Sequence, residues 1–185
     1  MKAHAMKKKT NIGWLIKIVL ISVAATMAFT LATNEILGRA GYITAIAMLA
    51  VFIIVGILFD MIGIAVTAAM EAPFHSMAAH RERGAAESIR LIKNADKVSS
   101  FCNDVVGDVS GIVSGGTAAL FAGRLVQGLN AENILIPLLI SGAVTGLTIG
   151  GKAAGKTLAI NNSTAIVHRV GKLLSLLSRT KRSRS

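Results

Sequence analysis

The sequence predicts an all-α integral membrane protein with four transmembrane helices, and three observations support this prediction. The chain of 185 residues is 53% hydrophobic and its mean hydropathy is +0.64, a balance that soluble globular domains do not have. Several apolar runs reach the length of about 20 residues that a helix needs to cross a bilayer. The basic residues are grouped beside or between these runs.

The expected spans cover residues 11–33, 43–70, 98–126 and 134–159. Basic residues precede the first span, lie between the second and third, and follow the fourth. By the positive-inside rule, this pattern places both termini in the cytoplasm, and we expect a multi-pass protein of the plasma membrane. The first span also has features of a signal peptide, so its cleavage remains an alternative. Lys17 within the apolar run favours a retained helix.

The chain divides into three parts on this basis. Residues 1–42 hold a basic N-terminus and the first transmembrane helix, residues 43–160 a transmembrane core, and residues 161–185 an amphipathic helix with a basic tail. The net charge of +11 and the low aromatic content of 4% favour anionic lipid headgroups over nucleic acid as the partner of the basic tails.

Two segments outside the spans alternate apolar and charged residues, and both are expected to form amphipathic helices on the cytoplasmic surface. The first is residues 71–97 and the second is residues 163–182. Their apolar faces are expected to lie in lipid or against a neighbouring helix. The apolar residues are Phe74, Met77, Ile89, Leu91 and Ile92 in the first segment, and Ile166, Val170, Leu173, Leu174 and Leu177 in the second.

Charged residues inside the spans are the strongest functional signal. Asp104 and Asp108 lie four residues apart and share one face of the third span. A charge at such depth costs about 3 kcal/mol unless it meets protein or water. Lys152 in the fourth span lies at a similar depth and is expected to pair with one of the two. The alternatives are that Asp104 is interfacial and that Lys152 snorkels to the headgroups.

Other polar and small residues complete the expected site. Asn103 lies beside Asp104, Asp60 is expected to face the bundle interior from the second span, and Glu71 lies where that span ends before Pro73. Glycines four residues apart are typical of close helix contacts in membranes. The expected contact between the third and fourth spans uses Gly107, Gly111 and Gly115 on one side and Gly142, Gly146 and Gly150 on the other.

The stretch GGKAAGKT, residues 150–157, matches the phosphate-binding loop of nucleotidases. Such a site also needs an acidic residue for Mg²⁺ from a later strand, but no Asp or Glu follows Glu132. We therefore expect a helix end and no nucleotide. The single cysteine, Cys102, and the scattered histidines give no metal-ligand spacing, so no tightly bound cofactor and no enzyme activity are expected.

Four short stretches carry a family resemblance when they are taken in order. They are AAMEAPF around Glu71, RGAAESIRLIKNADKV, VVGDVSG around Gly107, and GKAAGKTLA at residues 151–159. Over residues 57–166 the chain resembles the transmembrane domain of the cyclin M (CNNM) and CorB/CorC family of magnesium transporters. The resemblance implies a three-span core after one extra N-terminal span, a homodimer, and Mg²⁺ or another divalent cation as the transported ion.

The chain departs from this family at the positions expected to hold the ion. The family's serines are Ala68 and Met70 here, its asparagine is Asp108, and its glutamate is Lys152. A protonated lysine has no lone pair and repels Mg²⁺. Asp104 and Asp108 are therefore the best candidates for metal ligands.

Three functions remain open from the sequence. The leading hypothesis is cation transport through a modified site formed by Asn103, Asp104, Asp108 and Lys152, with Asp60 and Glu71 as further candidates. The second is a membrane scaffold or accessory subunit that does not transport. The third is an intramembrane aspartyl protease that uses Asp60 and Asp108 as a carboxylate pair.

Overall fold

The computed structural model describes residues 12–39, 41–128 and 134–182, which are helical and contain no strand. The long helices are α1 (Ile12–Arg39), α2 (Tyr42–Ala68), α6 (Asp108–Gly128), α7 (Leu135–Asn161) and α8 (Ser163–Arg182). Shorter helices α3 (Ala72–Ala79), α4 (Ala85–Lys93) and α5 (Ala95–Ser100) follow α2, and a π-helix, η1 (Phe101–Gly107), joins α5 to α6.

Four helical stretches are long and apolar enough to cross a membrane: Ile12–Ile36, Tyr42–Ala68, Ala95–Gly128 and Leu135–Asn161. The prediction of an all-α chain with four such helices is therefore confirmed. The first helix continues to Arg39 beyond the expected end of the first span at Thr33, because polar residues end an apolar run without ending a helix.

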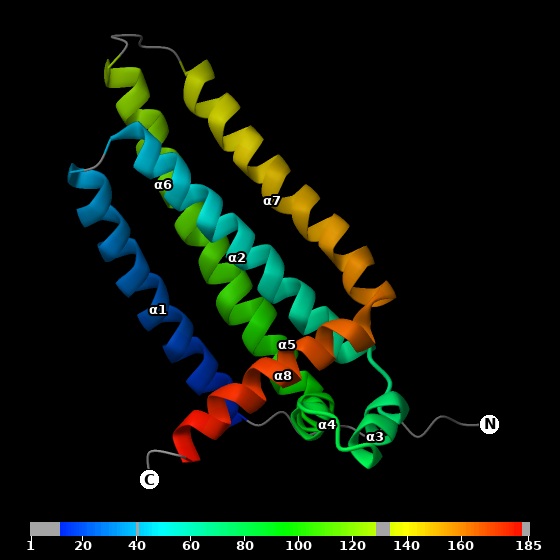
Figure 1. The fold of residues 1–185 in the computed structure, drawn as a ribbon. Helices are drawn as coiled ribbons and strands as arrows, with labels where there is room; N and C mark the ends of the chain where they lie inside the picture. Colours follow the sequence, from blue (N-terminus) through cyan, green and yellow to red (C-terminus); the bar gives the residue numbers. More distant parts are fainter. Residues whose placement is uncertain (1–11, 40, 129–133, 183–185) are drawn as a thin grey trace.

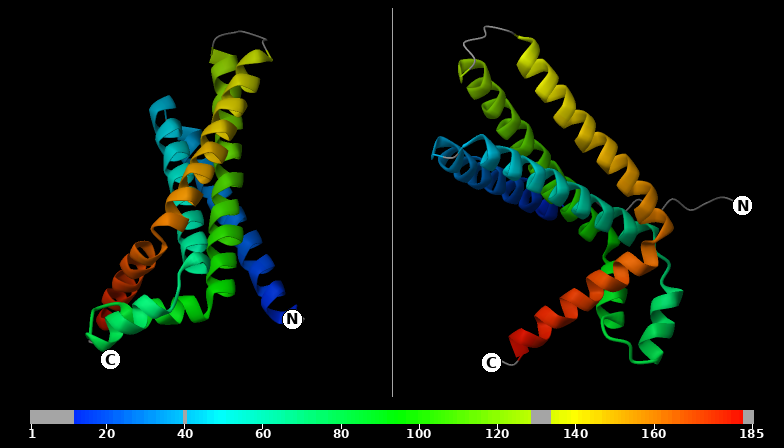
Figure 2. Two further views of the ribbon diagram at one scale, coloured as in Figure 1. Left: turned by 90° about the vertical axis from the view of Figure 1, so that its right-hand side faces the viewer. Right: turned by 45° about the horizontal axis from the view of Figure 1, so that its top comes forward.

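The long helices α1, α2, α6 and α7 lie side by side, and α8 crosses one end of the bundle, with α3 and α4 near it (Figures 1 and 2). We call this end the α8 end. Helix α2 is central, because it packs against α6, η1 and α7, whereas α1 packs mainly on α6 and η1.

The segment expected to form an amphipathic surface helix, residues 71–97, is divided into α3, α4 and α5. Pro73 lies in the first turn of α3, where its missing N–H costs no helical hydrogen bond. The chain turns between α3 and α4 with Arg81 at φ 54° and Gly84 at φ 84°. The left-handed backbone at Gly84 suits a residue without a Cβ.

The buried core lies at the α8 end and joins the long helices to the short ones. It contains Ala65, Val66, Phe74, Ala159 and Val167. The apolar residues expected on one face of segment 71–97 pack against this cluster, so that face meets protein. The leucines of α8 remain exposed, Leu173 at 61% and Leu177 at 69%.

The glycine contact expected between the third and fourth spans is wrong in its details. A Cβ at Gly111, Gly115, Gly142, Gly146 or Gly150 would meet open space. Helices α6 and α7 do touch, but the tight glycine contacts are made with α2. A Cβ at Gly151 would collide with Ile57, and a Cβ at Gly155 would lie 2.9 Å from Cγ of Met61.

Helices α4 and α8 cross at nearly direct backbone contact. A Cβ at Gly171 would collide with the Ser88 hydroxyl and lie 2.5 Å from the Gly84 carbonyl oxygen. The Ser88 Oγ donates to the carbonyl oxygens of Gly84 at 2.8 Å and Val167 at 3.2 Å. This crossing attaches α8 to the segment that follows α2.

We predict that Gly171→Val separates α8 from α4, because its side chain has no room at the crossing. Overpacking of this kind costs about 1–3 kcal/mol. A thermal unfolding scan and limited proteolysis of α8 in detergent would detect the change. The matched control is Ala165→Val, on an exposed position of the same helix, and equal stability of the two variants would contradict the prediction.

Candidate functional site

The polar residues of the third span lie on two kinds of helix. Asn103 and Asp104 belong to the π-helix η1, and Asp108 begins α6. A π-helix adds a residue to the turn and is frequent at functional sites. The insertion changes which side chains before and after Gly107 share a face, so the third span is not one continuous α-helical surface.

Asp108 and Lys152 form an ion pair between α6 and α7. The Lys152 Nζ lies 3.7 Å from the Asp108 Oδ1, and the two side chains are 27% and 67% exposed, respectively. Lys152 is nine residues before the end of α7, which is about 13 Å from that end. The expected pairing of Lys152 is thus observed, and Asp108 is the partner.

Asp60 reaches the same place from α2. A Cβ built on Gly107 would lie 3.7 Å from the Lys152 Nζ and 3.9 Å from an Asp60 Oδ atom. Gly107 is buried, and its missing side chain leaves the small space that these two charged groups flank. We call Asp60, Asp108 and Lys152 the charged centre.

Asn103 packs on α2 one turn further toward the α8 end. A Cβ at Gly63 would collide with the Asn103 amide, so the glycine allows this side chain to lie against the α2 backbone. The Asn103 Nδ2 donates to the Ser99 Oγ at 3.3 Å. Its buried Oδ1 lies against the α2 backbone at Gly63 and finds no hydrogen-bond partner among the described residues.

Two further sequence candidates are exposed at the surface. Glu71 is exposed in the turn between α2 and α3, where its Oε2 is 3.4 Å from the His75 Nε2. Asp104 is exposed on η1. In the part of the chain that the structure describes, no three His, Cys, Asp or Glu side chains are grouped closely enough to hold a metal ion.

The stretch that matches a phosphate-binding loop, residues 150–157, lies wholly inside α7. Its backbone N–H groups are therefore directed along a helix rather than around a phosphate. The expectation of a helical segment is confirmed, and Lys152 contributes to the charged centre instead.

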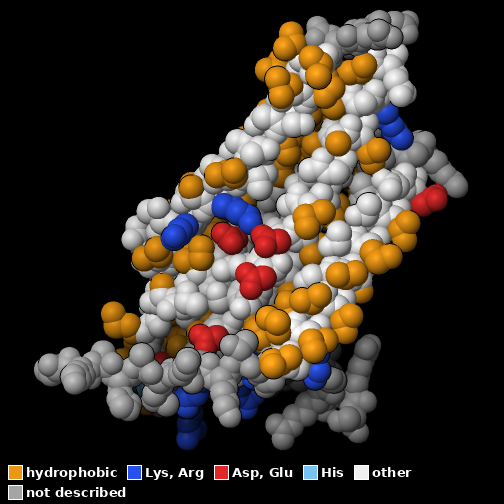
Figure 3. Space-filling view, turned by 180° about the vertical axis from the view of Figure 1, so that it is seen from behind, with side chains coloured by type: hydrophobic (Ala, Val, Ile, Leu, Met, Phe, Trp, Pro, Cys, Tyr) orange, Lys and Arg blue, Asp and Glu red, His pale blue; other side chains and the backbone are white. Residues whose placement is uncertain are grey.

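The charged centre carries two carboxylates and one ammonium group. Figure 3 shows that acidic and basic side chains gather midway along one long face of the molecule. One negative charge is left over when Lys152 and Asp108 neutralise each other. An excess of carboxylates over ammonium groups attracts a cation, and the Lys152 ammonium group must move away before Asp108 can become a ligand.

Sequence reasoning missed a row of buried hydroxyls on α6. Ser110, Ser114 and Thr117 are 5%, 1% and 1% exposed, and their spacing of four and three residues places them on one face. The spacing of these hydroxyls is visible in the sequence. The glycines between them form a repeat of four residues, which indicates helix packing and drew the interpretation to the glycines instead. Ser110 lies against Gly56 of α2, where an added Cβ would be 3.2 Å from the serine Cβ.

No protein-family model, no curated protein and no solved structure matches this chain.

We predict that Asp108 and Lys152 stabilise each other, because their opposite charges lie 3.7 Å apart and removal of one leaves the other without its partner. Asp108→Asn and Lys152→Gln should each destabilise the protein, and the double variant should recover part of the loss. The coupling should be about 1 kcal/mol, below that of a fully buried pair because Asp108 is largely exposed.

Thermal or denaturant unfolding in one detergent would measure this double-mutant cycle. The matched control cycle replaces Asp108→Asn by Asp104→Asn, since Asp104 is the other acid on the same segment. Additive effects in the Asp108 cycle, or equal coupling in both cycles, would contradict the ion pair.

Proposed function

We propose that this chain is a multi-pass membrane protein that carries a cation past the charged centre, with Mg²⁺ or another divalent cation as the transported ion. The observation that carries the proposal is the Asp108–Lys152 pair with Asp60 at the same glycine. Ionisable residues within a membrane span are costly and usually mark an ion or proton pathway.

The order of the elements supports the same proposal. A central span is followed by short surface helices, a second span in which Gly107 and Asp108 lie where η1 meets α6, a third span with Lys152, and a closing surface helix. This is the order that the resemblance to the CNNM and CorB/CorC transmembrane domain implies. In that family the protein is a homodimer, and we extend this expectation to the present chain.

The groups around the proposed ion site are not all acids. Asp108 supplies a carboxylate once Lys152 has left it, Asp60 supplies a second, and Asn103 on the adjacent π-helix supplies an amide oxygen once it leaves its place against Gly63. Oxygen ligands of this kind suit Mg²⁺, which keeps several of its waters. Lys152 then acts as an internal cation that occupies the centre when no ion is bound.

A second function is favoured by one specific observation. Lys152 is only 27% exposed and already neutralises Asp108, so the pair would also serve as a fixed link between α6 and α7. In that case the protein is a scaffold or accessory subunit, and the basic tail and surface helices contact anionic lipid or a partner protein. The structure gives Asp108 a lysine partner, whereas a protease requires two carboxylates that share a proton.

We predict Mg²⁺ flux when the purified protein is placed in liposomes loaded with a Mg²⁺-sensitive dye. Asp108→Asn should reduce this flux to the rate of empty liposomes, because it removes the carboxylate that faces the ion. Glu87→Gln is the matched control, since this acid lies on α4, away from the charged centre, and it should leave flux unchanged.

Lys152→Glu separates the two proposed functions. Flux in the natural protein that is lost in Asp108→Asn supports transport. Absence of flux in the natural protein together with its gain in Lys152→Glu would support the scaffold, because the lysine would then block the site. Equal flux in the natural protein and in Asp108→Asn would refute the site assignment.

A further inference from the structure

Two charged side chains next to the charged centre have no partner within the chain. Asp104 on η1 and Lys156 on α7 are both exposed, and both lie inside helical stretches that are long and apolar enough to cross a membrane. Among the residues that the structure describes, neither takes part in an ion pair. A charge exposed within a membrane span is costly unless it meets water or protein.

Asp104 and Lys156 lie at about the same level of the bundle. Asp108 and Lys152, which meet at 3.7 Å, define one level. Asp104 is four residues before Asp108, and Lys156 is four residues after Lys152, so each lies about one turn away on the same side of its helix. Because α6 and α7 run in opposite directions (Figure 1), both steps lead toward the α8 end.

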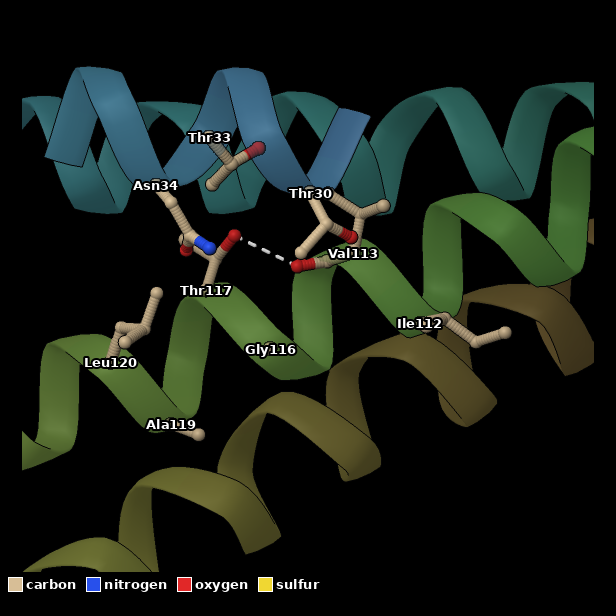
Figure 4. Close-up of a pocket in the computed structure, with 9 residues that line it drawn as sticks. All are labelled: Thr30, Thr33, Asn34, Ile112, Val113, Gly116, Thr117, Ala119 and Leu120. Carbon is tan, nitrogen blue, oxygen red and sulfur yellow. Dashed lines mark hydrogen bonds between the residues drawn. The ribbon is translucent and has the colours of Figure 1, made fainter. Parts of the chain in front are cut away.

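The side of α6 that carries Asp108 is not covered by the described part of the chain. Gly111 and Gly115 follow Asp108 by three and seven residues and share its side of the helix, and a Cβ at either glycine would meet nothing within 4 Å. Helix α1 lies on the other side of α6, where Thr117 is directed toward Asn34 (Figure 4). Glycines at this spacing allow another helix to approach closely in a membrane.

Opposite charges at one level of one face fit a second copy of the same chain. A two-fold axis along the membrane normal keeps every residue at its own level, and across such an interface residue i meets residue j while j meets i. An axis that passes in front of the face, between Asp104 and Lys156, therefore brings the lysine of each copy to the aspartate of the other. The face is complementary to itself in charge.

We propose that two copies of the chain associate through this face, with Asp104 of each copy paired to the partner copy's Lys156. The open glycines of α6, Gly111 and Gly115, let the two copies approach closely. This inference rests on the homodimer in the proposed function and names the surface that forms it. Asp108, which is 67% exposed within one copy, then lies beside protein instead of lipid.

Charge reversal tests this interface without any flux measurement. Asp104→Lys places two ammonium groups opposite each other at each contact, and Lys156→Asp places two carboxylates there. Like charges directly opposed disfavour association, so neither variant should associate with itself. The two variants mixed together should associate, because the introduced lysine of one copy meets the introduced aspartate of the other, and the two natural residues still form their own pair.

Each chain is co-expressed with two affinity tags, and the amount of one tag retained on resin for the other is measured in a mild detergent. We expect each variant paired with itself to retain at most a fifth of the natural amount, and the mixed pair to retain at least half of it. Thr157→Asp is the matched control, because Thr157 is exposed beside Lys156 but points about 100° away around α7. It should associate with itself like the natural protein and should not restore association of Asp104→Lys.

Natural self-association that persists in both charge-reversed variants would overturn this interface and leave a homodimer that uses another face. Failure of the mixed pair to associate, when both variants elute as monomers in the same detergent, would also overturn it. A natural protein that is monomeric would overturn the interface and the homodimer together. Since association needs no ion gradient, each of these results is distinct from a failure of transport.

Discussion

Close packing of α2 against its neighbours at glycines is the constraint on which the rest of the structure depends. Gly63 allows the Asn103 side chain to lie on the α2 backbone, and Gly56 does the same for Ser110. From the opposite side, Gly151 and Gly155 of α7 admit side chains of α2. In a bilayer, where lipid and protein are equally apolar, such close approach is a main source of helix association.

This packing also decides where the charges lie. Asp60 is four residues after Gly56 and three before Gly63, so it shares their helix face and is directed at the same neighbours. Lys152 follows Gly151 at the place where α7 meets α2. The charged centre is thus a consequence of the small residues beside it, because larger ones would hold the helices too far apart for the 3.7 Å ion pair between Asp108 and Lys152.

Hydropathy and helix rise were sufficient to predict the main framework. The four apolar helices follow from run lengths, and the partnership of Lys152 with an aspartate follows from equal depth. The choice of Asp108 over Asp104 depends on the π-helix at Phe101–Gly107, for which the local sequence has no clear signal. The glycines that bring α7 close to α2 are instead Gly151 and Gly155, because a repeat of small residues does not specify which neighbouring helix it meets.

The helices of the bundle differ in how firmly they are held. The charged centre lies among α2, α6 and α7, which are joined through glycine contacts and the ion pair. By contrast, α1 packs on α6 and η1 and touches α2 through the edge-to-face pair of Phe29 and Phe52, whose ring centroids are 5.8 Å apart. A displacement of α1 therefore breaks fewer close contacts than a displacement of α7. The charged centre is therefore held more firmly than the α1 side of the bundle.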